Sequence, residues 1–505
     1  MNNVNVSGPI QPTATYKTKV LKGNHSFASQ VTEPNMKYVI KHDFVLDGDV
    51  AIPENCVLEF DGGSLNGKHT ITFNKTELIS PKFANATFAG TIKNYSVSAI
   101  GMGLDNTGSY DNSDVLLSLL LILPWTGTEL IFEAGTYNIN KRITIPDTQA
   151  SFYLTGSGYQ RTIIKATSTN AGITFTNLLR STIKELRFNA GSYKRTTPFI
   201  NVDNGVGVIN VTTFHQCSFI GNKAFYSKFG GYCRFDECTA AIWESLSTDE
   251  WCIKLKGEYY YLNNCYFGGA TFVENNTPSF LVINSVHVYI QNCDFCNIIN
   301  GNAIELLGTC RYVNIDTTTF MRDTYLIKVD NSISVNNINV NADVYDERYI
   351  DKFVYFVSSS TGICWNLNFI FKVYGNFKDF DSFSGNVVSV PTRNCKVVFV
   401  CDNTAIRFPI PDNQNIYFIY PFNENIQGTS DPQTGIGEVV LLSNSPYNDL
   451  TVPVLVGCVD QQWSGIVNAH FENTFGGDFK LVFENYSHGG ASKFRLLMEQ
   501  KPNSI

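Results

Sequence analysis

The chain has 505 residues and a net charge of −8, from 37 basic and 45 acidic residues. Its length excludes a single compact core and favours about three domains or one elongated repeat array, and its acidic balance argues against non-specific nucleic-acid binding. Only 16% of residues are charged, whereas 13% are aromatic, with 37 Phe and 25 Tyr, and this composition favours strands and turns over helices.

The beginning of the chain is predicted to be an arm followed by small β-coils. Residues 1–11 are polar, and no charged region is followed by an apolar stretch, so we expect no secretory signal. No segment has the 18 or more apolar residues of a membrane span, so we expect no membrane insertion. Residues 1–35 are predicted to be an N-terminal arm that is flexible or depends on a partner. Residues 36–100 contain short strand-like stretches between Asp-Gly and Asn-Gly corners, which predicts a small β-coil region.

A group of motifs follows the small coils. An Asp-rich turn at residues 105–114 precedes the apolar segment Val115–Leu123, which is predicted to be a short helix. The strand-like stretch Glu129–Ile139 and the turn Gly156-Ser-Gly158 come next. Together these motifs resemble the opening of the pectate-lyase superfamily of right-handed β-helices, which includes phage tailspikes and tail fibres. Glu133-Ala134 departs from the pattern, since the family often has Pro and a small residue there.

The middle of the chain contains five self-similar stretches. Their aligned small residues are separated by steps of 21, 27, 28 and 25 residues, which suit the coils of a β-solenoid. These aligned residues are Cys217, Cys238, Cys265, Cys293 and Thr318. Strand alternation directs a second aligned set inward, namely Phe214, Phe235, Leu262, Ile290 and Ile315. The spacing and alternation predict an all-β chain with a β-solenoid in its middle, and the resemblance implies that residues 101–402 form a right-handed parallel β-helix with a short capping helix.

The thirteen cysteines are predicted to be small core residues that keep free thiols. Their number is odd, and no signal peptide directs the chain to an oxidising compartment. The only Cys-x-x-Cys is Cys293–Cys296, and no second pair has zinc spacing. We therefore predict no metal site and no cofactor. Asn264 and Asn292 align one residue before the cysteines, and we expect them to form a short internal ladder.

After residue 402 the coil pattern fades, and strands alternate with turns. Residues 403–505 are predicted to be a C-terminal antiparallel β domain, sandwich-like, that covers the open end of the β-helix. The resemblance implies that such a domain trimerises or binds host glycans. It also implies that residues 1–35 attach the protein to other virion or tail proteins. It implies less about chemistry, because many unrelated activities share this scaffold.

An outward-facing column of rings is the most suggestive functional feature. The alignment places Tyr232, Tyr259, His287 and Tyr312 at one exposed position, and Arg234, Tyr261, Tyr289 and Asn314 two residues further on. Aromatic rings with polar neighbours suit sugars, which offer apolar faces and hydroxyl edges. Aromatic residues also favour subunit interfaces, so contact with sister subunits in a trimer is the other interpretation. The candidate carbohydrate-binding or subunit-interface residues are Tyr232, Tyr259, Tyr261, His287, Tyr289 and Tyr312.

Carboxylates are the candidates for glycoside hydrolysis, which needs two of them on either side of the scissile bond. Asp236, Glu237 and Asp316 lie at coil corners, and an insertion contributes further acidic residues, namely Glu244, Asp249 and Glu250. A solvated corner is the other interpretation for each of them. No coil has the Asp/Arg clustering expected of calcium-dependent pectate lyases. The catalytic residues, if there are any, are therefore unknown from the sequence.

Three functional hypotheses follow. The first is a phage tail fibre or tailspike-like virion protein, homotrimeric, that recognises a bacterial surface polysaccharide; a virion protein needs no secretory signal because lysis releases it. The second is a polysaccharide depolymerase, a glycoside hydrolase or a lyase, on the same scaffold. The third is a purely structural virion component. Activity on capsular glycans would separate the first two.

Overall fold

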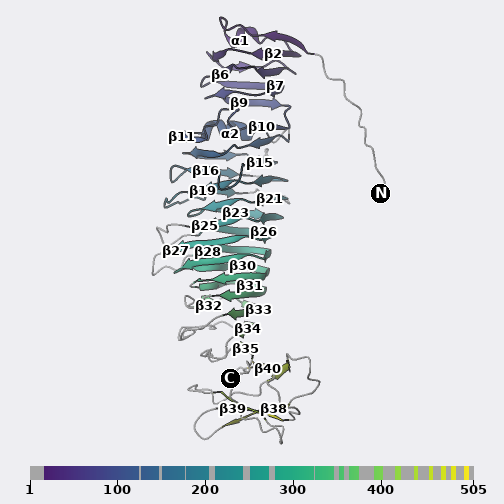
Figure 1. The fold of residues 1–505 in the computed structure, drawn as a ribbon, viewed down its shortest axis with the longest axis vertical. Coiled ribbons are helices and arrows are strands. Elements are labelled where there is room, and N and C mark those ends of the chain that lie inside the picture. The colour runs from purple at the N-terminus through teal and green to yellow at the C-terminus, as the bar shows by residue number, and fades with distance from the viewer. Residues whose placement is uncertain are drawn as a thin grey trace, which may run out of the picture.

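The protein is an elongated column of parallel β-strands, seen here in a computed structural model (Figure 1). The structure describes residues 16–123, 127–146, 151–176, 178–203, 211–242, 251–271, 279–323, 325–345, 352–357, 363–374 and 392–401, and the strands at 416–421, 437–441, 454–458, 468–473, 479–484 and 494–499. In this part of the chain, no helix has the length and apolar character needed to span a membrane.

Small coils form the N-terminal end of the column. Their elements are β1 (Lys17–Val20), α1 (Phe27–Gln30), β2 (Met36–Ile40), β3 (Asp43–Val45), β4 (Val50–Ala51), β5 (Val57–Phe60), β6 (Ser64–Asn66), β7 (Thr70–Ile79), β8 (Phe83–Ala84) and β9 (Thr87–Ile92). β1 pairs in parallel with β2, and Leu21 and Phe27 are buried against the end of the core. From Lys17 onwards, the range predicted to be an arm therefore belongs to the first coil.

One helix, α2 (Ser113–Ile122), separates the small coils from the main β-helix. It contacts β9 on one side and β14 on the other, and it buries Leu116, Leu119 and Leu120 between them. This is the capping helix that the apolar segment predicts. It covers the first coil of the main β-helix, which would otherwise expose its apolar interior.

In the main β-helix, each coil contributes up to three strands, which pair with the equivalent strands of the next coil. The early strands are β10 (Ser96–Ser98), β11 (Thr107–Asp111), β12 (Glu129–Ile131), β13 (Gly135–Ile139), β14 (Arg142–Ile145), β15 (Tyr153–Thr155), β16 (Thr162–Ala166), β17 (Gly172–Phe175), β18 (Thr182–Lys184), β19 (Arg187–Asn189) and β20 (Ile200–Val202). The middle strands are β21 (Thr212–His215), β22 (Ser218–Ile220), β23 (Phe225–Gly230), β24 (Cys233–Asp236), β25 (Thr239–Ala241), β26 (Ile253–Asn263), β27 (Tyr266–Thr271), β28 (Ser279–Gln291) and β29 (Asp294–Ile299).

The later strands are longer because they run through corners of the coil. They are β30 (Asn302–Met321), β31 (Tyr325–Tyr345), β32 (Lys352–Val357), β33 (Ile363–Tyr374) and β34 (Thr392–Cys401). β35 (Ile416–Pro421) still pairs in parallel with β34. The last strands pair in antiparallel fashion and are β36 (Gly437–Leu441), β37 (Val454–Cys458), β38 (Asn468–Asn473), β39 (Phe479–Glu484) and β40 (Phe494–Glu499). The predicted fold class, a right-handed parallel β-helix with an antiparallel C-terminal region, is confirmed.

The core consists of stacked inward columns. Phe214, Phe235 and Leu262 occupy equivalent positions on three successive strands, and Ile290 and Ile315 continue the column. The Phe214 and Phe235 rings stack at a centroid distance of 5.2 Å. Strand neighbours lie about 4.8 Å apart, so parallel stacking of like side chains is the geometry that the ladder imposes. The inward column predicted by alternation is confirmed.

The aligned cysteines form a second buried column. Each thiol of Cys217, Cys238, Cys265 and Cys293 donates to a backbone carbonyl of the preceding coil, at 3.3 to 3.6 Å. The nine cysteines with described side chains are all buried, and none forms a disulfide. Burial raises the pKa of the Cys238 thiol well above its usual value. For these nine cysteines, the prediction of free core thiols is confirmed.

The expected internal ladder of Asn264 and Asn292 is wrong. Both residues have a φ of 52° and lie at the bend before the cysteine, with their side chains exposed. A left-handed residue turns the chain between two strands, and the bend directs its side chain away from the core. Asn suits this position because it tolerates positive φ better than most residues.

Candidate functional site

The candidate site lies on one face of the middle coils, on β21, β24 and the C-terminal parts of β26 and β28. At the corner that leads into this face, Tyr232, Tyr259, His287 and Tyr312 occupy equivalent positions with φ of 53°, 57°, 59° and 55°. Positive φ is uncommon for any residue other than glycine and rarer for bulky ones. Asn337 and Asn366 continue the same position with φ of 55°. The corner therefore repeats over six coils and projects one side chain outward from each.

The rings at this corner form a continuous stack. Tyr232 and Tyr259 lie 4.8 Å apart, Tyr259 and His287 4.6 Å, and His287 and Tyr312 5.0 Å, all within 8° of parallel. Tyr232 is 41% exposed and Tyr312 51% exposed, whereas the two inner rings are half-buried. The stack therefore presents its outer edge to solvent along its length.

A second column runs beside the stack, two residues further along each strand. Thr213, Arg234, Tyr261 and Tyr289 are in register on four successive strands. The Tyr261 and Tyr289 rings stack at 5.1 Å, and Tyr261 lies 6.4 Å from Tyr232. The structure thus places all six candidate residues on one surface. Whether they bind a ligand or a sister subunit stays a prediction.

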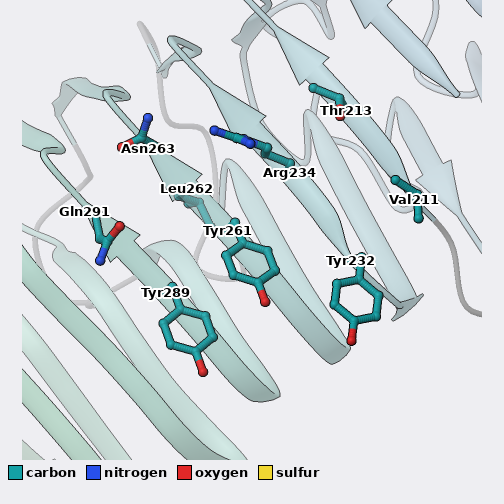
Figure 2. Close-up of a pocket in the computed structure, with 9 residues that line it drawn as sticks. All are labelled: Val211, Thr213, Tyr232, Arg234, Tyr261, Leu262, Asn263, Tyr289 and Gln291. Carbon is teal, nitrogen blue, oxygen red and sulfur yellow. The ribbon is translucent and has the colours of Figure 1, made fainter. Parts of the chain in front are cut away.

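Between these columns lies a groove of about 430 Å³ (Figure 2). It is lined by Val211, Thr213, Tyr232, Arg234, Tyr261, Leu262, Asn263, Tyr289 and Gln291. Figure 2 shows the rings of Tyr232, Tyr261 and Tyr289 in a row, with their hydroxyl groups pointing to the same side. Neither Tyr259 nor His287 lines the groove, because their faces are covered by the corner stack.

Parallel stacking determines which parts of the rings a ligand can reach. Within each column, ring faces contact other rings, so the middle of a column offers only edges and hydroxyl groups. The upper face of Tyr232, toward the N-terminal end of the column, is adjacent to Val211, and in the described part of the chain no ring covers it. The upper face of Tyr261 is next to Arg234, and the ring of Tyr232 stacks on it at 6.4 Å. The uncovered face of Tyr232 lies at the groove, where a flat apolar group can pack on it.

The tyrosine hydroxyl groups are available for hydrogen bonding. Those of Tyr232, Tyr261 and Tyr289 have no partner among the described residues. Burial, followed by the neighbouring phenols, raises the pKa of Tyr261, so its hydroxyl stays protonated near neutral pH and can donate as well as accept.

Polar side chains on the other side of the groove form a network around Asp236. Asn263 donates from Nδ2 to Asp236 Oδ1 at 2.9 Å. Arg234 Nη2 lies 3.7 Å from the same oxygen, and His215 Nδ1 lies 3.5 Å from Oδ2. The Arg234 side chain is 54% exposed, so its other donors remain open to solvent or a ligand. This network holds one acidic and one basic group at fixed positions beside the aromatic rings.

The predicted carboxylates do not form a hydrolytic pair on this face. Asp236 and Asp316 are three strands apart in the ladder, or about 14 Å at the usual strand spacing, beyond the 9.5 Å or so of an inverting pair. Glu237 directly follows Asp236 at the bend after β24, and Gln216 of the preceding coil donates to it at 2.7 Å. Glu244, Asp249 and Glu250 lie outside the described residues. Among the described residues, no His, Cys, Asp and Glu cluster could hold a metal ion.

The sequence alignment identified the rings, whereas it left out several residues of the groove. Val211, Thr213, Asn263 and Gln291 line it without being singled out by residue type. They occupy the same aligned positions as the rings, or the next outward position along the strand. Asn263 and Gln291 lie inside the aligned stretches, and following the outward alternation one position beyond Tyr261 and Tyr289 would have singled them out.

No family model matches the sequence, and no curated protein matches it. Solved structures that are similar include a double mutant of the tailspike protein of E. coli bacteriophage HK620, at 12% identity over 97% of this chain and 86% of that one, with a TM-score of 0.36. The Dettilon tailspike protein matches at 10% identity over 80% and 94%, with a TM-score of 0.36. The HK620 tailspike in complex with a pentasaccharide matches at 12% identity over 96% and 85%, with a TM-score of 0.33. At these identities and TM-scores, the comparison assigns no activity or ligand to this chain.

Proposed function

We propose that this chain is a tailspike-like virion protein and that its aromatic groove binds a bacterial surface polysaccharide. The observation that supports this most directly is the groove itself, in which an uncovered ring face, free phenol hydroxyl groups and polar side chains lie side by side. Sugars combine apolar ring faces with hydroxyl edges, and each of the three features complements one of these properties.

The geometry favours binding over cleavage on this face. None of the residues that line the groove carries a carboxylate, and the nearby Asp236 already accepts a hydrogen bond from Asn263. Both retaining and inverting hydrolysis require a second carboxyl group within about 9.5 Å. A depolymerase that uses residues outside the described part of the chain is the second hypothesis, and release of reducing sugar ends from a bound polysaccharide would demonstrate it.

The location, oligomeric state and protein partners that we propose follow from the tailspike-like interpretation of the chain. A tailspike-like protein is part of the phage tail, forms a homotrimer and contacts other tail proteins through its N-terminal region, residues 1–35. The net charge of −8 is consistent with a protein that does not bind nucleic acid. A trimer interface made by the ring columns is the competing interpretation of the site, so the test must report oligomeric mass as well as glycan binding.

The test is an array of purified bacterial capsular and O-antigen polysaccharides, probed with wild-type protein and the double variant Y261A/Y289A. Loss of two ring contacts should weaken binding about tenfold or more. The matched control is Y345A/Y374A, which removes another stacked tyrosine pair, 4.8 Å apart, on a neighbouring sheet. The control should bind as the wild type does. Dissociation of the Y261A/Y289A oligomer with glycan binding retained would instead establish the interface interpretation.

A further inference from the structure

The column that contains Tyr261 and Tyr289 does not end at the groove. In the strand ladder, Tyr289 pairs with Asn314, Asn314 with Asn339, and Asn339 with Asn368. Three asparagines therefore project outward from three successive coils directly below the tyrosines. At about 4.8 Å per coil, they extend the column by about 14 Å.

These asparagines differ from the structural asparagines of the same coils. At the corner, Asn366 donates to Asn337 at 3.0 Å, and Asn337 donates to Asn336 at 3.0 Å, so that column bonds within itself. By contrast, the side chains of Asn314, Asn339 and Asn368 have no hydrogen-bond partner among the described residues. They are exposed or half-buried. Two asparagine columns thus run side by side, and only the corner column is satisfied internally.

Strand stability does not explain why asparagine occupies positions 314, 339 and 368. Asn is depleted in β-strands, where Thr, Val and Tyr pack better. Each of the three amides still has two donors and one acceptor to offer. An uncharged row of this kind complements hydroxyl groups, whereas it offers neither the charge that attracts an ionic ligand nor the apolar area of a protein interface.

The step from Tyr289 to Asn314 in this column leaves one tyrosine ring face uncovered. The Tyr289 ring stacks on Tyr261, so its upper face is covered, and in the described part of the chain no ring covers its lower face, next to Asn314. Asn side chains are shorter than Tyr side chains, so the surface steps inward below Tyr289. An apolar ring face therefore overhangs the first of the free amides.

We infer that Asn314, Asn339 and Asn368 form an extended subsite for uncharged, hydroxyl-rich sugars, and that one polysaccharide chain runs along the axis from the groove onto this subsite. This inference rests on the proposed function. A pyranose ring is comparable in length to the coil rise of about 4.8 Å, so each coil can offer one phenol or amide to one sugar. Continuity with the groove identifies the occupant as the same linear glycan and not a second ligand.

The test measures affinity against ligand length. The probe is a size-fractionated series of oligosaccharides, prepared by partial hydrolysis of the polysaccharide that binds best on the array. For the wild type, affinity should rise up to about seven sugars, since seven coils from Thr213 to Asn368 span about 29 Å. The N314A/N339A/N368A variant should bind fragments of about three or four sugars as the wild type does, and longer fragments about 10- to 100-fold more weakly.

Two further variants separate binding from folding. Replacing the same three residues by Val raises strand propensity and removes the amides, so the same loss is expected from a stable protein. The control T319A/K372A changes outward residues of the neighbouring sheet in the same coils and should behave like the wild type. A wild-type affinity that stops rising at groove length, an unchanged length dependence in the triple variants, or their dissociation into monomers would overturn the inference. If no polysaccharide on the array binds, the proposed function fails first, and the subsite fails with it.

Discussion

Arg195 allows a quantitative test of how successive coils are held together. It is only 2% exposed and, among the residues that the structure describes, is the largest fully buried side chain. Its guanidinium donates to the backbone carbonyls of Thr197 at 3.2 Å, Ser168 at 3.2 Å and Ala190 at 3.1 Å, and also to that of Ala171. None of these partners is a carboxylate. One buried cation therefore joins the loop that follows β19 to the corresponding loop of the preceding coil.

The change R195M keeps most of the apolar volume and removes the donors. Hydrogen bonds to a charged donor contribute about 1.5–3 kcal/mol each, so four of them contribute about 6–12 kcal/mol before the cost of burying the charge. That cost is several kcal/mol for one ion, and Met does not incur it. We therefore expect the free energy of unfolding of these coils to fall by about 3–5 kcal/mol, since buried carbonyls lose their donors.

The assay should report on individual coils, because each coil of a solenoid contacts only its neighbours. In hydrogen exchange followed by mass spectrometry, peptides between residues 162 and 202 should lose protection in R195M, whereas those between residues 279 and 299 should not. The control is K194M, which removes the same charge from an exposed neighbouring position and should change stability by less than about 0.5 kcal/mol. Equal protection in R195M and K194M would refute the reasoning.

Two further predictions concern buried titratable groups. The nine buried cysteines should react slowly with a thiol reagent in the native protein, and all 13 thiols should react in denaturant without reductant; a lower final count would mean disulfides. Burial raises the pKa of Asp323 to about 8, and its Oδ1 accepts from the Ile298 amide at 2.8 Å. Folding then favours the protonated carboxyl, so relative to D323N the wild type should lose stability as pH rises from about 4 to about 8; a difference that is constant with pH would contradict this.

The inward columns could be predicted because two independent sequence signals agree on them. Strand alternation and the aligned cysteines both place Phe235 and Leu262 inside, and the register follows from either. The outward rings follow from the same alignment. The alignment does not predict which ring faces are covered. That depends on parallel stacking at 4.6 to 5.1 Å, which is determined by the coil rise together with the side-chain torsion angles.

The sequence pattern could not predict the conformation of the corner tyrosines or the burial of Arg195. A left-handed conformation favours Gly, Asn and Asp, so Tyr232 and Tyr259 at a corner with positive φ have no sequence signal beyond their repeat. Charged residues are usually solvated, so nothing in the sequence marks Arg195 as buried. Its burial depends on four carbonyls that only the folded loops bring together.

The repeat itself favours a polymer as the ligand of this face. Along the axis, outward positions recur about every 4.8 Å and form runs of like residues, such as the two tyrosines and the three asparagines of the second column. Across the face, the chemistry changes within one coil, from the ring of Tyr232 to the guanidinium of Arg234 and the carboxylate of Asp236. A compact ligand would contact one or two coils and leave the others unused. A linear glycan parallel to the axis contacts every coil, so weak contacts that repeat along the column add to a specific affinity.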